Sequence, residues 1–446
     1  MRQVTPMLGK TFRGGVHPEE CKFYAPHTVY EPRGELVYPL AQHIGKPAKP
    51  LVAVGDRVLV GQKLAERDGY ISSCIHSSVS GTVTAIEPRA TIMGSGECIV
   101  VRSDGAFELY PGVGEAVDPD SLSPEEIISR VREAGVVGLG GASFPTPVKL
   151  EPKDRSAIEY VILNGAECEP YITCDDDLMR QKAPEIVEGL RILLKIFPNA
   201  EGVILIEKNK PEAIAAMQKA IEGEKKMRIH VAPVKYPQGD ERAVVKVVAG
   251  KDTKLSQLPA DVGCLVDNVA TVYAIYEAVC LSTPLFRRLV TVSGTAVRTP
   301  GNFLVRAGTS CAELLEAAGG LKEGAEAAKA LSGGPMMGIA MASLDVPLQK
   351  SSGAIVLLAE DEAEQSETKL TECIRCGRCV HACPMGLSPL LMAEAALRGD
   401  LQRYEQKLYG LECISCGSCT WVCPAKRPLM QTFKDAKDAI LSARRK

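Results

Sequence analysis

Two stretches near the C-terminus share one cysteine pattern: residues 373–386 read CIRCGRCVHACPMG, and residues 413–426 read CISCGSCTWVCPAK. Both follow C-x-x-C-x-x-C-x-x-x-C-P. Three thiolates, each separated from the next by two residues, can hold one [4Fe–4S] cluster through a tight loop. The fourth cysteine, displaced by another turn and followed by proline, points away, and in two-cluster ferredoxins it ligates the other cluster. The repeat therefore predicts two clusters, each completed by the other half.

The predicted ligand sets cross between the two stretches. One cluster is assigned to Cys373, Cys376, Cys379 and Cys423, and the other to Cys413, Cys416, Cys419 and Cys383. Zinc also binds paired CxxC units and is the alternative, although a zinc site rarely needs four cysteines per half with a proline after the last. The segment between the stretches is predicted to be one helix, with Ser388 as its cap, Pro389 in its first turn and Gly410 at its end.

The composition is ordinary for a soluble globular protein: 46% of the residues are hydrophobic, 24% are charged, and the net charge is -3. The nearly balanced charge gives no electrostatic basis for binding nucleic acid. No apolar run approaches the roughly 18–20 residues of a membrane-spanning helix, and the first residues lack the apolar core of a signal peptide. We therefore expect a chain that folds in the cytoplasm.

Upstream of the cysteines, a glycine cluster precedes a strand that ends in polar residues. Gly138, Gly140 and Gly141 would let backbone N–H groups close on a phosphate, with Lys149 adding a positive charge, although a plain tight turn is the alternative. A predicted buried strand, 160–163, then leads directly into Asn164, Glu167 and Glu169. Open α/β sheets bind their ligands at such strand ends. Asp175, Asp176 and Asp177, farther along, are interpreted as solvated capping acids.

Four motifs in a fixed order carry a family resemblance. GLGGASFPTPVK (138–149), NGAECEP (164–170), YPQGDE (236–241) and DNVAT (267–271) resemble those of the NADH-binding flavoprotein subunit of respiratory complex I. The resemblance implies that these segments bind FMN and present its ring to NADH, with no catalytic acid–base residue. The implied cofactor contacts come from Gly138, Gly140, Gly141, Phe144, Lys149, Asn164, Glu167, Glu169, Tyr236, Gly239, Asp240, Glu241, Asn268 and Thr271. Lys149 would hold the FMN phosphate, and Phe144 and Glu169 would face the nicotinamide nucleotide.

The segments on either side of the flavin-like motifs indicate which subfamily the chain resembles. Residues 51–89 are similar to the barrel-sandwich fold of biotinyl and lipoyl carriers, and residues 289–321 are similar to a soluble-ligand-binding β-grasp (SLBB) module. The segment TFRGGVHPEECK (11–22) belongs with this arrangement, and the whole chain resembles the C subunits of Rnf electron-transport complexes. The expected fold is multidomain α/β. The expected divisions are an N-terminal arm (1–40), a barrel-sandwich domain (41–112), a Rossmann-like FMN/NADH domain (113–286), an SLBB domain (287–345) and a helical two-cluster ferredoxin domain (360–446).

The resemblance implies an oxidoreductase subunit that passes electrons between NAD(H), FMN and the two clusters. Through partner subunits, this transfer would be coupled to ferredoxin oxidoreduction and ion translocation. It implies integral-membrane and ferredoxin-like partner subunits, a peripheral position on the cytoplasmic face of the inner membrane, and membrane contact only through those partners. Two alternatives remain open. The chain would otherwise be a cluster-carrying subunit of a soluble NADH-linked reductase, or a docking subunit with a vestigial flavin site, because Ala166 and Asp240 depart from the family's motifs.

Overall fold

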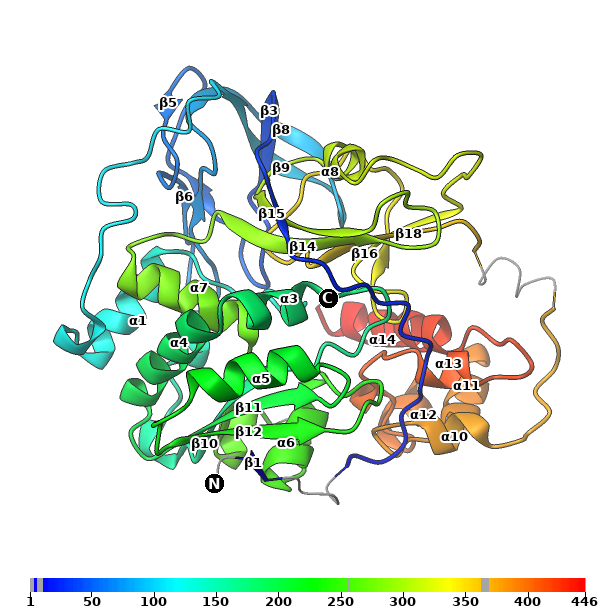
Figure 1. Cartoon of the computed structure of the whole chain (residues 1–446). Helices are drawn as coiled ribbons and strands as arrows, with labels where there is room; N and C mark the ends of the chain where they lie inside the picture. Colours follow the sequence, from blue (N-terminus) through cyan, green and yellow to red (C-terminus); the bar gives the residue numbers. More distant parts are fainter. Residues whose placement is uncertain (1–3, 6–10, 255–256, 362–368, 446) are drawn as a thin grey trace.

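The computed structural model describes residues 4–5, 11–254, 257–361 and 369–445 (Figure 1). The predicted N-terminal arm, FMN/NADH domain and ferredoxin domain each include residues outside these ranges. Four sheets occur in the described part of the chain. No described helix is long and apolar enough to cross a membrane.

The barrel-sandwich domain consists of two small antiparallel sheets around one core. The four-stranded sheet has the order β3-β9-β8-β5, and the three-stranded sheet has the order β4-β6-β7. Leu36, Tyr38 and Leu64 are among its buried residues. Since β3 pairs with β9 along its whole length, the sheet begins before residue 41, where the sequence placed the boundary. The strands are β3 (Glu35–Pro39), β4 (Lys49–Pro50), β5 (Arg57–Val58), β6 (Lys63–Glu66), β7 (Ile75–His76), β8 (Gly81–Thr91) and β9 (Gly94–Ser103).

The parallel-sheet domain is built on five strands in the order β1-β12-β11-β10-β13. Every neighbouring pair is parallel. The chain runs outward from β10 through β11 to β12 and then returns to place β13 on the other side of β10. The strand order therefore reverses between β10 and β13, and such a switch point is where open α/β sheets bind ligands. The strands are β1 (Val4–Thr5), β10 (Tyr160–Gly165), β11 (Glu201–Glu207), β12 (Met227–Ala232) and β13 (Cys264–Asn268).

Helices cover both faces of this parallel sheet. Five of them share one large core, while α6 packs into a second core that also contains Phe12. The first helix, α1, begins as predicted: Ser123 and Glu126 form a reciprocal capping box and Pro124 opens the helix. The helices are α1 (Pro124–Glu133), α2 (Thr146–Lys149), α3 (Cys174–Gln181), α4 (Ala183–Ile196), α5 (Pro211–Ala220), α6 (Glu241–Ala249) and α7 (Val269–Cys280), with short 3-10 turns at Pro119–Ser121, Arg155–Ala157 and Pro259–Val262.

The mixed-sheet domain follows, with the strand order β17-β16-β18-β14-β15-β2. Strand β18 pairs with both β14 and β16, so the sheet extends past residue 345, where the sequence placed its end. Strand β2 joins the other edge, which ties the N-terminal arm into this domain. The elements are β2 (Thr28–Tyr30), β14 (Arg287–Ser293), β15 (Gly301–Arg306), α8 (Cys311–Ala317), β16 (Lys329–Ser332), β17 (Ile339–Ala340) and β18 (Ala354–Leu358).

The C-terminal helical domain carries both cysteine stretches. The prediction of one helix from Ser388 to Gly410 is wrong. Gly399, at φ 71°, ends the first helix, and Asp400 caps a second by accepting from the Arg403 N–H. A glycine in the left-handed region is a common helix stop. The elements are α10 (Arg378–Ala382), α11 (Pro389–Leu397), α12 (Leu401–Gln406), a 3-10 turn (Gly410–Glu412), α13 (Ser418–Trp421) and α14 (Leu429–Arg445).

Candidate functional site

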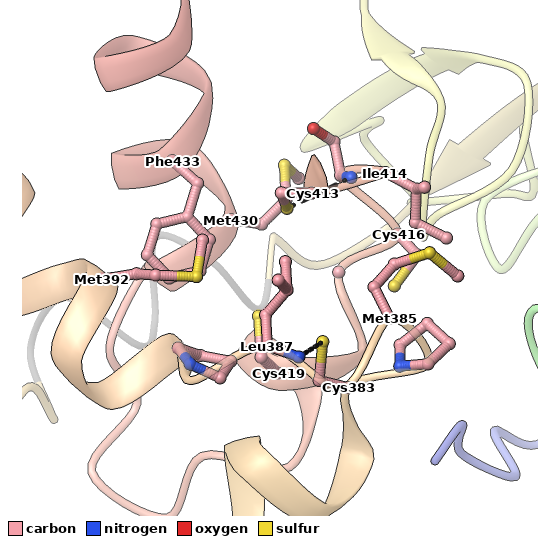
Figure 2. Close-up of a pocket in the computed structure, with 14 residues that line it drawn as sticks. Cys383, Met385, Leu387, Met392, Cys413, Ile414, Cys416, Cys419, Met430 and Phe433 are labelled. Atoms are coloured by element: carbon pink, nitrogen blue, oxygen red, sulfur yellow. Dashed lines mark hydrogen bonds between the residues drawn. The ribbon is translucent and has the colours of Figure 1, made fainter. Parts of the chain in front are cut away.

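Four cysteines from both stretches face one small cavity in the C-terminal helical domain (Figure 2). They are Cys383, Cys413, Cys416 and Cys419, and we call them the inner cysteine group. Apolar side chains, including Met392 and Phe433, complete the lining. The backbone N–H of Leu387 donates to the Cys383 sulfur at 3.4 Å, and that of Ser415 donates to the Cys413 sulfur at 3.4 Å. Hydrogen bonds of this kind tune a cluster's reduction potential.

The remaining four cysteines, Cys373, Cys376, Cys379 and Cys423, form the outer cysteine group, which is more exposed than the inner one. Burial raises the pKa of the Cys379 thiol, and the neighbouring charges of Cys423 and Cys373 raise it further. In the inner group, burial raises the pKa of the Cys413 thiol, and Cys383 acts in the same direction. Cys423 therefore lies close enough to Cys379, and Cys383 close enough to Cys413, for their charges to interact across the two stretches.

The two cysteine loops share one backbone geometry. Arg375 and Ser415, at equivalent positions, both adopt positive φ, at 54° and 55°. The glycines two residues later, Gly377 and Gly417, both have φ 74°.

The switch point of the parallel sheet brings the flavin-like motifs together. Asn164, at the end of β10, and Asn268, at the end of β13, are register partners. The Asn164 side-chain amide donates to the Gly239 carbonyl at 2.9 Å, and the Asn268 amide donates to Asp175 Oδ2 at 2.6 Å. A Cβ on Gly140 would lie 3.2 Å from the Asn268 Cβ. The glycine loop, both strand ends and the YPQGDE motif thus meet at one edge of the sheet.

The glycine loop is fixed at its base and open at its tip. Its Leu139 N–H donates to Thr271 Oγ1 at 2.9 Å, which ties the loop to the first turn of α7. The Gly138 N–H donates to the Phe144 carbonyl at 2.8 Å and closes the turn. Gly140 and Gly141 are exposed, and Gly141 has φ 131°, which side chains rarely adopt. Such a loop can present backbone N–H groups to an anion.

Lys149 is already paired within this site. Its ammonium group donates to the Val266 carbonyl at 2.6 Å and to Glu241 Oε1 at 3.1 Å, and it lies 3.6 Å from Asp267 Oδ1. Burial alone would lower the pKa of Lys149, but the Asp267 and Glu241 carboxylates outweigh that effect and the pKa is raised. Lys149 therefore keeps its charge at neutral pH. The buried Asp267 Oδ2 has no hydrogen-bond partner among the described residues.

The acidic residues after β10 are more buried than the sequence suggested. Glu167 accepts from the backbone N–H groups of Asp175 at 2.8 Å and Asp176 at 3.4 Å, at the start of α3. Asp176 and Asp177 are only 2% and 1% exposed, so the interpretation of these acids as solvated is wrong. Burial, followed by the charge of Glu167, raises the pKa of Asp175 to about 7. Glu167 and Asp175 form a compact acidic pair with Cys174.

Glu169 is covered by a loop of the mixed-sheet domain. Its carboxylate accepts from the backbone N–H groups of Met336 at 3.1 Å and Met337 at 2.8 Å. Burial raises the pKa of Glu169 to about 7. A Cβ on Gly334 would lie 2.3 Å from Glu169 Oε2, so this loop packs directly on the acid. The residue that the sequence directs toward the nucleotide thus lies where two domains meet.

Tyr236 lies between the switch point and the inner cysteine group. Its hydroxyl donates to the Cys416 carbonyl at 2.8 Å, and its side chain is buried. Nearby, Asp240 caps α6 by accepting from the Arg242 and Ala243 N–H groups. Arg242 in turn forms an ion pair with Glu412 at 2.7 Å. The YPQGDE motif therefore connects the parallel-sheet domain to the C-terminal helical domain.

The sequence interpretation passed over Gln238, which lies inside the same motif. Its side chain is 0% exposed, and neither its amide nitrogen nor its amide oxygen has a hydrogen-bond partner among the described residues. An unpaired buried amide is costly, about 1–3 kcal/mol for each group. A polar ligand would relieve that cost, so Gln238 joins the candidate site. Its position between Tyr236 and Gly239 was the available signal.

Comparison with protein families agrees with this layout. The Nuo51 FMN-binding domain matches residues 131–277 and the RnfC barrel sandwich hybrid domain matches residues 10–106. The SLBB domain matches residues 289–340, and two 4Fe-4S dicluster models match residues 372–427 and 340–388. The predicted multidomain α/β fold, with these four kinds of domain, is confirmed.

Several relatives are similar over nearly the whole chain. The C subunit of the proton-translocating ferredoxin:NAD(+) oxidoreductase complex of Clostridium ljungdahlii is 42% identical, over 90% of this chain and 88% of the relative. The C subunit of the Na(+)-translocating complex of Acetobacterium woodii is 38% identical over 98% of each chain. The solved NAD+-reducing [NiFe]-hydrogenase in its H2-reduced state has a TM-score of 0.52 and 18% identity, over 74% of this chain and 67% of that chain, which supports the fold alone.

Proposed function

The chain belongs to the family of C subunits of ion-translocating ferredoxin:NAD(+) oxidoreductase complexes, and we propose that it is the subunit that exchanges electrons with NAD(H). Its cofactors are FMN and two [4Fe–4S] clusters. The main support for the proposal is the hydrogen bond from the Tyr236 hydroxyl, in a flavin motif, to the carbonyl of Cys416, in a cysteine loop. One polypeptide thus joins a two-electron site to one-electron sites.

The residues at the switch point would hold FMN. Gly140 and Gly141, at the open tip of the glycine loop, offer backbone N–H groups for the phosphate, and Lys149 offers a positive charge. Asn164, Asn268 and the unpaired Gln238 amide offer polar contacts. When bound, FMN accepts two electrons with a hydride and releases them singly, which no side chain here can do. The protein contributes binding, orientation and exclusion of water.

The two cysteine groups would take different positions in the electron route. The inner group lies next to Tyr236 and is largely buried, whereas Cys373 and Cys376 of the outer group are exposed. We assign the cluster nearer the flavin to the inner group. The outer group would then face a partner that donates or accepts electrons.

The partners follow from the family. The relatives are subunits of multi-subunit complexes, so this chain works with other subunits. We propose that these are integral-membrane and ferredoxin-like subunits, and that the chain is peripheral on the cytoplasmic face of the membrane and touches it through them.

The test is anaerobic reconstitution of the full chain with iron, sulfide and FMN, followed by addition of NADH. The proposal predicts bleaching of the flavin absorbance and then reduction of both clusters. A chain that binds clusters but no FMN would be a docking subunit with a vestigial flavin site. Complete NADH oxidation by a chain that never co-purifies with membrane subunits would favour a soluble reductase.

A further inference from the structure

The N-terminal segment 11–22, which the proposed function leaves without a role, lies between the two electron-carrying regions. It is the dark blue coil that passes the C-terminal helical domain in Figure 1. Two neighbouring residues contact opposite partners: the Gly15 N–H donates to the Ala382 carbonyl at 2.9 Å, and the Val16 N–H donates to the Tyr236 carbonyl at 2.9 Å. In turn, the Tyr236 N–H donates a hydrogen bond to the Val16 carbonyl at 2.9 Å.

Two glycines make this close approach possible. Gly14 has φ 66°, and a Cβ there would lie 2.5 Å from the carbonyl oxygen of Cys383. Gly15 has φ 82°, and a Cβ there would lie 2.6 Å from the Tyr236 carbonyl oxygen. Any side chain would therefore push the backbone of a predicted cluster ligand, or that of the flavin motif, away from the segment. The obstacle is backbone in both cases, so rotation of a side chain cannot relieve it.

The segment is anchored at both ends to the parallel-sheet domain. Lys235 donates to the Phe12 carbonyl at 2.8 Å and lies 4.4 Å from the centre of the Phe12 ring, which is buried in the core beneath α6. Farther along, Lys22 donates to the Glu167 carbonyl, and the Tyr171 N–H donates to the Glu20 carbonyl at 2.9 Å. The same stretch therefore braces the loop after β10.

We propose that residues 12–16 are a positioning strap, which fixes the Cys383 end of the inner cysteine group against Tyr236 for electron transfer between the flavin site and the first cluster. The inference rests on the proposed function and deepens it. Gly14 and Gly15 act through Cys383 and Tyr236 and have no chemical role of their own.

The test compares Gly14→Ala with Gly34→Ala in the reconstituted full chain. Gly34 also has positive φ, at 74°, but a Cβ there meets nothing within 4 Å, so this control carries the backbone penalty without the clash. We expect Gly14→Ala to bleach its flavin with NADH at the wild-type rate. Its cluster reduction should be several-fold slower than that of Gly34→Ala, because electron transfer weakens steeply as the two carriers move apart. Gly34→Ala should transfer electrons like the wild type.

A second readout does not depend on turnover. Hydrogen exchange of the Gly15 and Val16 amides, measured without NADH, should speed up in Gly14→Ala and not in Gly34→Ala. If Gly14→Ala does not fold, Lys235→Met provides the test, because it removes the hydrogen bond and the ring contact from Lys235 to Phe12 without introducing a clash. It should show the same pattern, faster exchange at these amides and slower cluster reduction.

Three results would overturn the strap. They are equal cluster reduction in folded Gly14→Ala and Gly34→Ala, unchanged amide exchange in both Gly14→Ala and Lys235→Met, or an equal loss of flavin bleaching and cluster reduction. A wild-type chain whose clusters NADH does not reduce would instead overturn the proposed function, and the strap's role with it.

Discussion

Lys149 allows its structural role to be separated from its predicted role toward FMN. Replacing it by methionine leaves Asp267, whose side chain is 1% exposed, without its cation. Breaking a buried ion pair from one side costs about 3–5 kcal/mol. Because the Lys149 side chain is itself 26% exposed, we expect the lower end, about 3 kcal/mol. The partner Glu241 is 42% exposed and adds about 1 kcal/mol at most.

Removing the unpaired Asp267 carboxylate should restore stability. The double variant Lys149→Met/Asp267→Asn buries no unpaired carboxylate, so it should recover to within about 1 kcal/mol of the wild type. Hydrogen exchange of the β13 amides reports the local opening free energy directly, which avoids assuming two-state unfolding of a multidomain chain. A double variant that is as unstable as the single variant would show that Asp267 is not the coupled partner.

The same double variant isolates the flavin contact. Charge-assisted contacts are worth about 1.5–3 kcal/mol, so the loss of Lys149 should weaken FMN binding by about ten- to a hundredfold even when stability is restored. Fluorescence titration of FMN into the flavin-free chain measures this. Wild-type affinity in the stable double variant would refute the placement of Lys149 at the phosphate and leave it a purely structural residue.

Three further outcomes are expected. Cys383→Ala should damage the cluster of the second stretch and Cys423→Ala that of the first, as followed by EPR; damage confined to each residue's own stretch would contradict the crossed ligation. Glu169 has its pKa raised from 4.5 to about 7, so the folded state holds its proton more tightly and stability should fall by up to about 3 kcal/mol as pH rises through that window. Glu169→Gln should flatten the dependence of the melting temperature on pH. An unchanged slope would contradict the assignment of this pH dependence to Glu169. Lys350→Met should lower the local opening free energy by about 2–4 kcal/mol, because it leaves the buried Gly135 carbonyl and the Cys74 carbonyl of the barrel-sandwich domain without their donor. Hydrogen exchange of the amides beside these two residues measures the change, and a loss below about 1 kcal/mol would contradict it.

The sequence was most informative where chemistry imposes spacing. The cysteine repeat predicted two groups that exchange their last members, and the strand predicted at 160–163, leading into Asn164, predicted a ligand site at a sheet edge. Both depend on local chain geometry. The helix after Ser388 was predicted as one element, because its apolar pattern continues across the stop at Gly399.

Contacts between domains lay beyond such reasoning. Nothing local in the sequence shows that Glu169 is covered by backbone N–H groups of a loop more than 160 residues later, at Met336 and Met337. The burial of Asp176 and Asp177 also depends on tertiary packing, since a run of three acids ordinarily lies in solvent. Gln238 was missed for a related reason, because an unpaired amide is recognisable only once its surroundings are known.

Metal and flavin analysis would show whether this single chain carries FMN and two four-iron clusters. Iron, zinc and flavin should be measured on the anaerobically purified full chain, together with EPR of the reduced protein. We expect about eight iron atoms per chain in two [4Fe–4S] clusters, with one FMN. About four irons per chain, or zinc in proportion to protein, would contradict it.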